Sequence, residues 1–472
     1  MTRVGGVVSI GVAAVAIVAA AQPAAPPARA VIEGVPHIRQ EPDFCGEACV
    51  AMYLRKLGYA VDQRAVFDRT GLDPRLGRGA YTAELKRAVE AFGFRPGPVW
   101  FKVGAGDAAA LAQARDAMYA DLARGVPSIV CMHYDGSPRA PEHFRLMLGF
   151  DRATGEVIYH EPGQDQGGYK RMPEARFLEL WPLKYERDSW TLIRIALEPG
   201  HLDVGGGRDP LSTVTPAALA QHVMKLKARA EIPEGYATRV VGPFFVIGDE
   251  SPARVDRYAK TIAWTVDHLK RDFHMREPPN VIDVWLLGGA DSYLENCLRL
   301  FGLRPSTPYG FFLPSQQALF MNIATGGGTL VHELVHPFIG ASFPAVPTWF
   351  NEGLASLYEA VREEHGEMWG LPNWRLAGLQ RAIRAGKLPS FAAMTGDTRE
   401  HFYVSGTSYA QARYLCLYLQ EKGLLHRYYD QFVAGVAGDP SGYKTLVRVL
   451  GNPDMSDFEK QWRGWVLALA GQ

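Results

Sequence analysis

The sequence has little cysteine and no excess of charge of either sign. It contains five cysteines in 472 residues, too few for the disulfide scaffold of a small exported domain. Lys and Arg together number 50, as do Asp and Glu, so neither a nucleic-acid groove nor a polybasic membrane patch is indicated. After the N-terminal region no run approaches the roughly 18 apolar residues of a membrane span. The length suits two domains, each able to bury a core.

The N-terminus is organised like a secretory signal. Residues 1–3 are basic, residues 4–21 are apolar, and residues 19–21 and 28–30 both fit a small-x-small cleavage rule. We interpret residues 1–30 as a signal peptide and a Pro/Ala-rich spacer. We therefore expect an exported protein, periplasmic or extracellular. An uncleaved N-terminal anchor is the alternative.

The most informative stretch is HELVH, an HExxH motif that begins at His332. In a helix, side chains four positions apart share a face, so His332 and His336 can bind one metal ion. Glu333, beside them, can take a proton from a water that the metal activates, as in zinc peptidases. Glu352, sixteen residues after His336, is the candidate third ligand, and Zn²⁺ is the expected cofactor. The alternative is an ordinary buried helical turn with two histidines.

The flanking sequence favours a metal site. Residues 318–323 predict a strand, and the glycines at 326–328 separate it from the histidine-bearing helix. Pro337 is expected to bend or end that helix, because it lacks a backbone donor. Residues 347–359 predict a second helix. If the two helices pack antiparallel, the carboxylate of Glu352 reaches the open side of the metal.

The block from about residue 318 to residue 359 resembles the gluzincin metallopeptidases, specifically the HExxH…W-x-x-E-G-x-A type. The resemblance implies a thermolysin-like domain with three zinc ligands, His332, His336 and Glu352. It also implies Glu333 as the general base.

A gluzincin also uses a Tyr or His donor to stabilise the oxyanion of the tetrahedral intermediate. Tyr409 and Tyr403 are the candidates at a suitable distance along the chain. Each is alternatively a packing tyrosine. Glu359, two helical turns after Glu352, is a weaker candidate for orienting a histidine ligand.

A second catalytic constellation lies near the start of the chain. Residues 44–54 predict a loop entering a helix, which places Cys45 at a helix N-terminus, where the dipole favours thiolate. Gln40 is close enough in sequence to donate to an oxyanion. His143 begins a predicted strand, and hairpin pairing brings Glu161 within two residues of it, where a carboxylate orients an imidazole. The strand alternates between two faces, one with Phe144, Leu146, Leu148 and Phe150 and the other with His143, Arg145 and Met147.

These residues resemble the papain-like family of bacteriocin-processing cysteine peptidases, which cut double-glycine leaders. The resemblance covers about residues 33–195 and rests on Gln40, Cys45, Gly46, Ala48, Met52, the His143 strand and a carboxylate before Pro162. It implies Cys45 as nucleophile, His143 as base, Glu161 as the orienting acid and Gln40 as the oxyanion donor.

Two positions depart from the pattern of that family. Glu161 stands where the family usually has Asp or Asn, and Phe44 stands where it usually has Asp just before the cysteine. Glu161 is one methylene longer, which changes the reach of the carboxylate. Alternatively, Cys45 and Cys49 are small buried residues one helical turn apart, or halves of disulfides.

We expect an α+β protein with two domains. Residues 31–198 are predicted to form a papain-like cysteine-peptidase domain, residues 199–216 a linker, and residues 217–472 a gluzincin-type domain. Helices are expected at residues 82–92, 108–124 and 292–301 and from residue 408 onward. Another helix is expected to begin at Pro252, with Ser251 as its cap. Strands are expected to begin at residues 128, 143 and 156 and to span residues 239–247 and 281–287.

The sequence therefore predicts an exported peptidase that hydrolyses peptide bonds in peptide or protein substrates, chiefly at the metal site. Nucleic acid is not expected as a partner, and neither is a membrane beyond a possible N-terminal anchor. Two alternatives stay open. The cysteine domain is an inactive peptide-binding module, or the cysteine site is the main catalyst and the zinc is structural.

Overall fold

The computed structural model describes residues 27–205, 213–229, 231–451 and 454–470. Most of the predicted signal peptide, residues 1–26, and part of the predicted linker, residues 206–212, lie outside these ranges. The chain divides into two compact units. The first comprises Met1–Arg39 and Phe94–Gly200, and the second comprises Gln40–Gly93 and His201–Gln472. Among the described residues, no helix has the length and apolar character needed to cross a bilayer.

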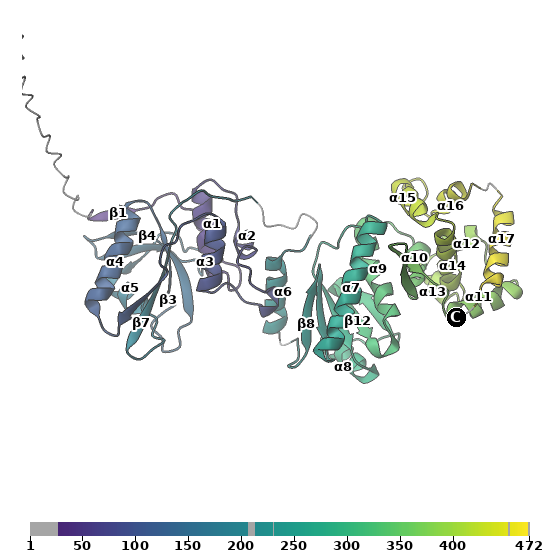
Figure 1. Cartoon of the computed structure of the whole chain (residues 1–472), viewed down its shortest axis with the longest axis horizontal. Helices are drawn as coiled ribbons and strands as arrows, with labels where there is room; N and C mark the ends of the chain where they lie inside the picture. Colours follow the sequence, from purple (N-terminus) through teal and green to yellow (C-terminus); the bar gives the residue numbers. More distant parts are fainter. Residues whose placement is uncertain (1–26, 206–212, 230, 452–453, 471–472) are drawn as a thin grey trace, which may run out of the picture. The chain divides into compact units, whose positions relative to one another are not determined.

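The first unit is built on an antiparallel sheet of seven strands. The order is β2-β7-β3-β4-β5-β6, and β1 pairs with β4. The strands are β1 (Arg29–Val31), β2 (Trp100–Gly104), β3 (Ser128–His133), β4 (Glu142–Asp151), β5 (Glu156–His160), β6 (Lys170–Pro173) and β7 (Ser189–Ala196). Helices α4 (Ala108–Ala123) and α5 (Glu174–Leu180) supply apolar side chains to one core with the sheet, and Figure 1 draws α4 beside β4 and β1.

The strands expected from residues 128, 143 and 156 are confirmed, but the alternation expected along β4 is wrong at its end. The pairing of β4 with β5 shifts register between Met147 and Gly149. This β-bulge inserts one residue and reverses the phase of the alternation after it. Phe150 consequently packs in the same cluster as Met147, although the sequence pattern placed the two on opposite faces.

The second unit contains a mixed five-stranded sheet in the order β11-β12-β10-β9-β8. The strands are β8 (Ala237–Val241), β9 (Phe244–Gly248), β10 (Ile282–Leu287), β11 (Gly310–Leu313) and β12 (Ala318–Asn322). The central strands β9, β10 and β12 are parallel, and β8 and β11 are antiparallel edge strands. The single strand expected at 239–247 is instead the hairpin β8–β9, which turns at Gly242, whose φ is +54°.

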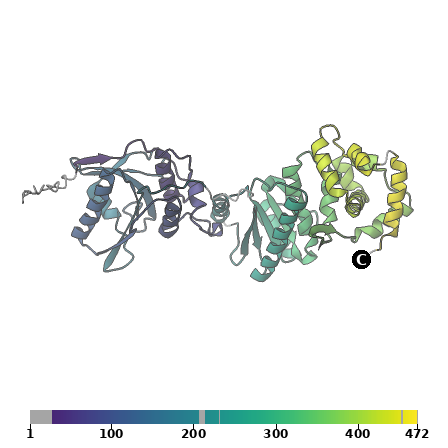
Figure 2. The same cartoon turned by 45° about the horizontal axis from the view of Figure 1, so that its top comes forward.

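Helices cover both faces of this sheet. Successive strand residues alternate between the faces: Val284 packs in the cluster with α7 (Pro252–Asp272) and α9 (Gly328–Ser342), and Trp285 in the cluster with α6 (Pro216–Ala228) and α8 (Ala290–Phe301). Figures 1 and 2 show α7 beside the strands. The predicted start of α7 at Pro252 is confirmed, but Ser251 makes no side-chain capping hydrogen bond.

The C-terminal part of the second unit is mainly helical, as the sequence predicts. It comprises a β13–β14 hairpin (Val361–Glu364 and Glu367–Gly370) and the helices α10 (Thr348–Leu357), α11 (Arg375–Arg384), α12 (Phe391–Thr395), α13 (Arg399–Val404), α14 (Ser408–Glu421), α15 (Leu425–Gly435), α16 (Tyr443–Leu450) and α17 (Met455–Ala468). The packing of α10 on α14 explains a motif glycine. A Cβ on Gly353 would meet Ala412 at 3.2 Å, so Gly353 permits this close approach.

The second unit also includes the segment with Cys45. Helices α1 (Cys45–Lys56), α2 (Gln63–Phe67) and α3 (Thr82–Ala91) and the 3₁₀ turn η1 (Pro74–Leu76) lie there. Phe44, Phe67 and Leu72 form a cluster with two alanines of α6, whereas Leu219 and Val223 of α6 pack towards Trp285. Because α6 contacts both groups, the compact units divide the chain differently from the sequence domains 31–198 and 217–472.

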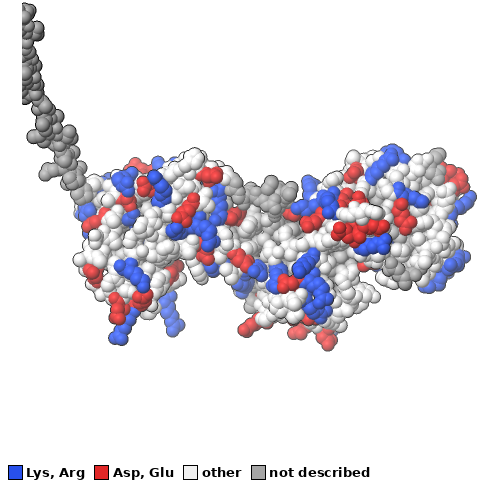
Figure 3. Space-filling view, in the orientation of Figure 1, with Lys and Arg blue, Asp and Glu red and all other residues white. Residues whose placement is uncertain are grey.

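Charged side chains of both signs are interspersed on the surface. In the face drawn in Figure 3, neither sign forms a continuous area over either unit. This distribution agrees with the equal numbers of basic and acidic residues.

Candidate functional site

The HExxH motif lies in the middle of helix α9. Of the two effects expected of Pro337, a bend or an end of the helix near His336, the end is wrong, because α9 continues to Ser342 with Pro337 inside it. A proline within a helix costs about 3 kcal/mol. Phe338 and Ile339 follow it and are fully buried, and burial of each contributes roughly 2 kcal/mol. Burial of these two side chains therefore outweighs the cost of the proline.

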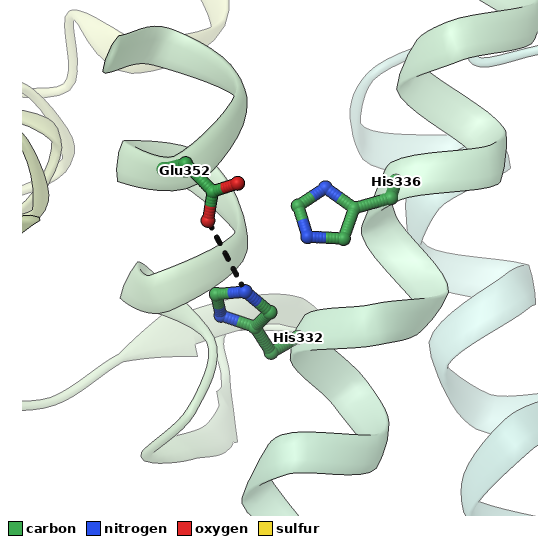
Figure 4. A group of neighbouring side chains, drawn as sticks. All are labelled: His332, His336 and Glu352. Carbon is green, nitrogen blue, oxygen red and sulfur yellow. Dashed lines mark ion pairs between the residues drawn. The ribbon is translucent and has the colours of Figure 1, made fainter. Parts of the chain in front are cut away.

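His332, His336 and Glu352 come together on α9 and α10, with their side chains directed towards one point (Figure 4). One potential ligand atom from each lies within 4.8 Å of the others. Nε2 of His332 is 3.4 Å from Oε2 of Glu352, and this oxygen is buried without a hydrogen-bond partner among the described residues. Ligand atoms about 2.1 Å from a tetrahedral zinc ion lie roughly 3.4 Å apart. The donor set and its spacing fit zinc.

The other nitrogen of each histidine also has a polar neighbour. Nδ1 of His332 is 3.3 Å from Oε1 of Glu359, a carboxylate that Arg375 contacts at 2.7 Å. Nδ1 of His336 is 3.0 Å from Oδ1 of Asn351. Such neighbours orient the imidazole rings of metal ligands and set their tautomers. The sequence indicated Glu359 only weakly, and Asn351 and Arg375 were missed.

Glu333 lies beside the proposed ligands and is held from the sheet side. Its Oε2 accepts a 3.0 Å hydrogen bond from the backbone N–H of Phe312 on β11. The same oxygen is 3.9 Å from Nε2 of His336. The edge strand therefore fixes a carboxylate next to the metal-ligand cluster, as a general base requires.

Tyr403 and Tyr409 both border this cluster. The hydroxyl of Tyr403 donates a 2.7 Å hydrogen bond to Oε1 of Glu352, and the two tyrosine rings are 5.9 Å apart between centroids. Burial and the charge of Glu352 raise the pKa of both tyrosines. Both hydroxyls thus keep their protons at neutral pH and are able to donate to an oxyanion.

These residues line one cavity of about 1300 Å³ in the second unit. Strand β11 and the segment before it form one part of its wall, and α9, α10, α11 and α13 contribute others. Its lining includes His332, Glu333, His336, Glu352, Tyr403, Tyr409, Tyr309, Phe311 and Phe312. The volume accommodates several residues of a peptide.

The first unit places the predicted base and acid of the cysteine site in contact. Nε2 of His143 is 2.5 Å from Oε1 of Glu161, and Nε of Arg145 donates to Oε2 at 2.6 Å. All three side chains are buried. Burial alone would raise the pKa of Glu161, but the hydrogen bond and charge of His143 and the charge of Arg145 lower it to about 2. Glu161 is therefore an ionised carboxylate at neutral pH, in contact with the imidazole of His143.

Glu161 contacts His143 although its side chain is one methylene longer than the Asp or Asn that the family usually has at this position. The longer side chain reaches Nε2 of His143 from a position just after β5, whose last residue, His160, pairs with Leu146. Gly163 also donates its N–H to Oε1 of Glu161, at 2.9 Å. Nδ1 is the nitrogen of His143 that Glu161 does not contact. Arg145 was not predicted as a partner, although its place two residues after His143 on one face was visible in the sequence.

Cys45 is the first residue of α1, as the sequence predicts. Two carboxylates tie the start of this helix to the segment before α3: Asp43 accepts the N–H of Gly79 at 2.8 Å, and Glu47 accepts the N–H of Ala80 at 2.7 Å. Glu47 is fully buried, and burial raises its pKa to about 8. Neither contact was predicted.

Gln40 and Cys45 belong to the second unit, and His143 and Glu161 belong to the first. The structure thus defines the two halves of the predicted Cys–His–acid site separately. Oε1 of Gln40 is buried without a hydrogen-bond partner among the described residues. All five cysteines lie in the described ranges, and none of them forms a disulfide there.

The comparisons with known proteins concern the N-terminal region. Residues 32–188 match the Peptidase C39 like family. The match supports a papain-type fold and a cysteine-type peptidase in this region, and it ends before the helices of the metal-ligand cluster.

A solved structure, the peptidase domain of Streptococcus ComA, is similar at 16% identity over 35% of this chain and 100% of that chain. That protein is described as a bi-functional ABC transporter involved in a quorum sensing pathway. The TM-score of 0.24 is too low to support an argument about the fold. No curated protein matches the chain.

Proposed function

We propose that this protein is an exported peptidase whose C-terminal part hydrolyses peptide bonds with the help of zinc. The observation that supports this most is the cluster of His332, His336 and Glu352 next to Glu333 in a large cavity. Bound zinc would supply a Lewis acid that polarises the scissile carbonyl and lowers the pKa of the attacking water. Export rests on the sequence of residues 1–30 alone.

The residues around the cluster have distinct roles in this proposal. Glu333, held by the N–H of Phe312, takes a proton from the attacking water and passes it to the leaving amine. Tyr409 or Tyr403 donates a hydrogen bond to the oxyanion. Tyr403 bonds Glu352 in this structure, and Tyr409 interacts with the same carboxylate, so both tyrosines stay candidates for this donor.

The edge strand β11 favours a peptide as the substrate. Among the described strands it pairs with β12 alone, and it lines the cavity through Gly310, Phe311 and Phe312. The free side of an edge strand offers N–H and C=O groups that an extended peptide can pair with. An extended substrate alongside β11 would pass Glu333, which is bonded to the same strand.

The N-terminal region is proposed to act as a cysteine peptidase, as the family match supports. Cys45 attacks the scissile carbonyl as a thiolate, and Nδ1 of His143 carries the proton to the leaving amine. Glu161 holds the imidazole through Nε2. An inactive peptide-binding module is the competing proposal, because Phe44 and Glu161 depart from the family pattern.

Cleavage of a mixed peptide library by the mature protein tests these proposals. Wild type is compared with Glu333→Gln and Cys45→Ala, and zinc content is measured in all three. Glu333→Gln is expected to keep its zinc and to lose most cleavage activity. Cys45→Ala is expected to keep its cleavage activity. Cleavage that depends on Cys45 alone would make the cysteine site the main catalyst and the zinc proposal wrong. Cleavage that neither substitution changes would contradict both sites.

A further inference from the structure

The lining of the proposed zinc-site cavity includes two chemically different groups of residues. One group comes from the start of α11 and from α13 and consists of Trp374, Arg399 and Tyr403, of which Trp374 is 71% exposed. The other group is uncharged and consists of Pro278, Pro279, Ile282, Pro337, Gly340 and Ala341. Such asymmetry lets a site distinguish the side chains on the two sides of a scissile bond.

The charges in the cavity are mostly matched, with one exception. Glu352 belongs to the metal-ligand cluster, and Arg375 pairs with Glu359 at 2.7 Å. Arg399 also lines the cavity, but within the described part of the chain it has no acidic partner. Its recorded contact is with the ring of Tyr403, whose centroid is 5.5 Å from its guanidinium carbon. Arg399 is thus an exposed cation in the cavity lining whose guanidinium has no acidic partner among the described residues.

Tyr403 connects Arg399 to the reacting centre. Its ring centroid is 5.5 Å from the guanidinium carbon of Arg399, and its hydroxyl bonds Glu352. An extended peptide advances by about 3.4 Å per residue. Side chains within a few residues of the scissile bond therefore reach Arg399. The exposed ring of Trp374 offers apolar surface against which their methylene groups can pack.

We propose that Arg399 selects substrates with a carboxylate on the α11–α13 side of the scissile bond. This inference rests on the proposed zinc peptidase activity. Because Arg399 is the cation without an acidic partner among the described lining residues, the preference is confined to the part of the cavity that Arg399 occupies. The carboxylate is either an Asp or Glu side chain or the C-terminus of the peptide, and a guanidinium binds both in the same bidentate way.

The test uses peptides with a single Glu, or Gln as its isostere, at each position around one scissile bond. Each is made with a free and with an amidated C-terminus. Wild type is expected to favour Glu over Gln at positions on one side only, by roughly 10- to 100-fold in kcat/KM. Arg399→Gln is expected to abolish the preference and spare Gln peptides, and Arg399→Glu to reverse it. Arg384→Gln, on the exposed end of α11 outside the cavity lining, is the matched control.

The two forms of the C-terminus separate the sources of the carboxylate. A preference that persists in amidated peptides identifies an acidic side chain, and one that needs a free C-terminus identifies a carboxypeptidase. An equal loss on Glu and Gln peptides in Arg399→Gln would overturn the proposal, because Arg399 would then bind the peptide backbone.

A measurement of peptide affinity distinguishes a failure of the Arg399 proposal from a failure of the proposed zinc-dependent activity. With Glu333→Gln as the host protein, Glu peptides should bind more tightly than Gln peptides, and Arg399→Gln in that host should remove the difference. Equal affinities for Glu and Gln peptides, together with equal affinities for free and amidated C-termini, would overturn the Arg399 proposal even if wild type cleaves peptides. Undiminished cleavage by Glu333→Gln would instead overturn the proposed zinc-dependent function.

Discussion

Arg145 donates a 2.6 Å hydrogen bond from Nε to Oε2 of Glu161, and both side chains are almost completely buried. The other oxygen of Glu161 contacts His143 and the N–H of Gly163. The guanidinium of Arg145 is fixed in turn by the carbonyl oxygens of His133 and Tyr134. Both oxygens of Glu161 are therefore constrained, which compensates for the longer and more flexible side chain of Glu.

The Arg145–Glu161 pair predicts a specific acid dependence of stability. Burial opposes ionisation of Glu161, but the hydrogen bond and charge of His143 and the charge of Arg145 together lower its pKa from 4.5 to about 2. A carboxyl group with a lowered pKa stabilises the folded state above pH 4.5, and this stabilisation is lost as the pH falls towards 2. Arg145→Met should raise the pKa of Glu161, so that the loss occurs at higher pH. The free energy of unfolding is measured from pH 2 to pH 7.

Two further variants make this measurement specific. Arg145→Lys keeps the charge and should shift the acid transition less than Arg145→Met. In Glu161→Gln the titrating group is gone, so adding Arg145→Met to that variant should change the acid dependence less than adding it to wild type. If Arg145→Met left the acid transition of wild type unchanged, the buried pair would not be what lowers the pKa.

Glu47 predicts a pH dependence of stability opposite to that of Glu161. Its pKa is raised to about 8 by burial, so between pH 4.5 and pH 8 the folded protein holds a proton that the unfolded chain has released. Stability from this group is present at low pH and is lost as the pH rises through that window. Glu47→Gln keeps an acceptor for the N–H of Ala80 and cannot ionise. We expect the variant to be more stable than wild type at pH 8, by on the order of a few kcal/mol, and similar at pH 4.5.

Thermal unfolding of both proteins at several pH values checks this expectation. Glu84→Gln is a suitable control, because Glu84 is a nearby carboxylate whose pKa is lowered by its bond with Arg78. That variant should not gain stability at pH 8. A constant difference between wild type and Glu47→Gln at all pH values would show that Glu47 is ionised throughout.

The sequence predicted the features that depend on local spacing. The period of four in HELVH places His332 and His336 on one face of a helix, and the strand before it and the helix with Glu352 were also expected. The hairpin after His143 was predicted because turn residues separate two strand-like runs. In each case the pattern lies within about 20 residues, where helix and strand periodicity determine which side chains are neighbours.

Features that depend on tertiary packing were not predictable in the same way. Burial of Phe338 and Ile339 keeps α9 helical through Pro337. Arg375 lies sixteen residues beyond the Glu359 that it contacts, so no helical period connects them. The packing of α6 on Phe44 and Phe67 joins segments about 150 residues apart. Apolar residues in α6 indicate a buried face but not which segment covers it.

Glu359 gives a prediction about metal affinity. It is the carboxylate 3.3 Å from Nδ1 of the proposed ligand His332, and it is fixed by Arg375 and Asn373. Loss of such a partner typically reduces metal affinity by about 10- to 100-fold. We expect this reduction for Glu359→Ala, measured as zinc retained in competition with a chelator. Glu367→Ala, an exposed carboxylate on the neighbouring hairpin, should bind zinc like wild type.

Two outcomes would contradict this role. If Glu359→Ala retained zinc as well as wild type, Glu359 would serve only to pair with Arg375. If Glu359→Ala and Glu352→Ala lost zinc equally, Glu359 would act as a ligand itself. A folding control is needed for each variant, because removal of either acid leaves a partly buried polar partner unpaired.

The contacts of α6 predict that the segment with Cys45 depends on residues after position 198. Gln221 donates to the carbonyl oxygen of Pro42 at 2.9 Å, and the N–H of Ala217 donates to Asp68 at 2.8 Å. Phe44, Phe67 and Leu72 are at most 8% exposed and pack in one cluster with α6. Each large apolar side chain contributes roughly 1.5–3 kcal/mol when buried, against a total stability of about 5–15 kcal/mol for a domain.

A chain of residues 31–198 should therefore be markedly less stable than a chain of residues 31–229 that retains α6. The longer chain exposes Leu219 and Leu226, which otherwise face the second sheet, so both are replaced by Lys to keep it soluble. Amide hydrogen exchange in α1 measures the local stability of the helix that begins with Cys45. Faster exchange in the shorter chain is expected because α6 covers Phe44, the residue directly before the proposed nucleophile. Equal protection of α1 in both chains would mean that the segment around Cys45 folds without α6 and that the contacts of α6 add little to its stability.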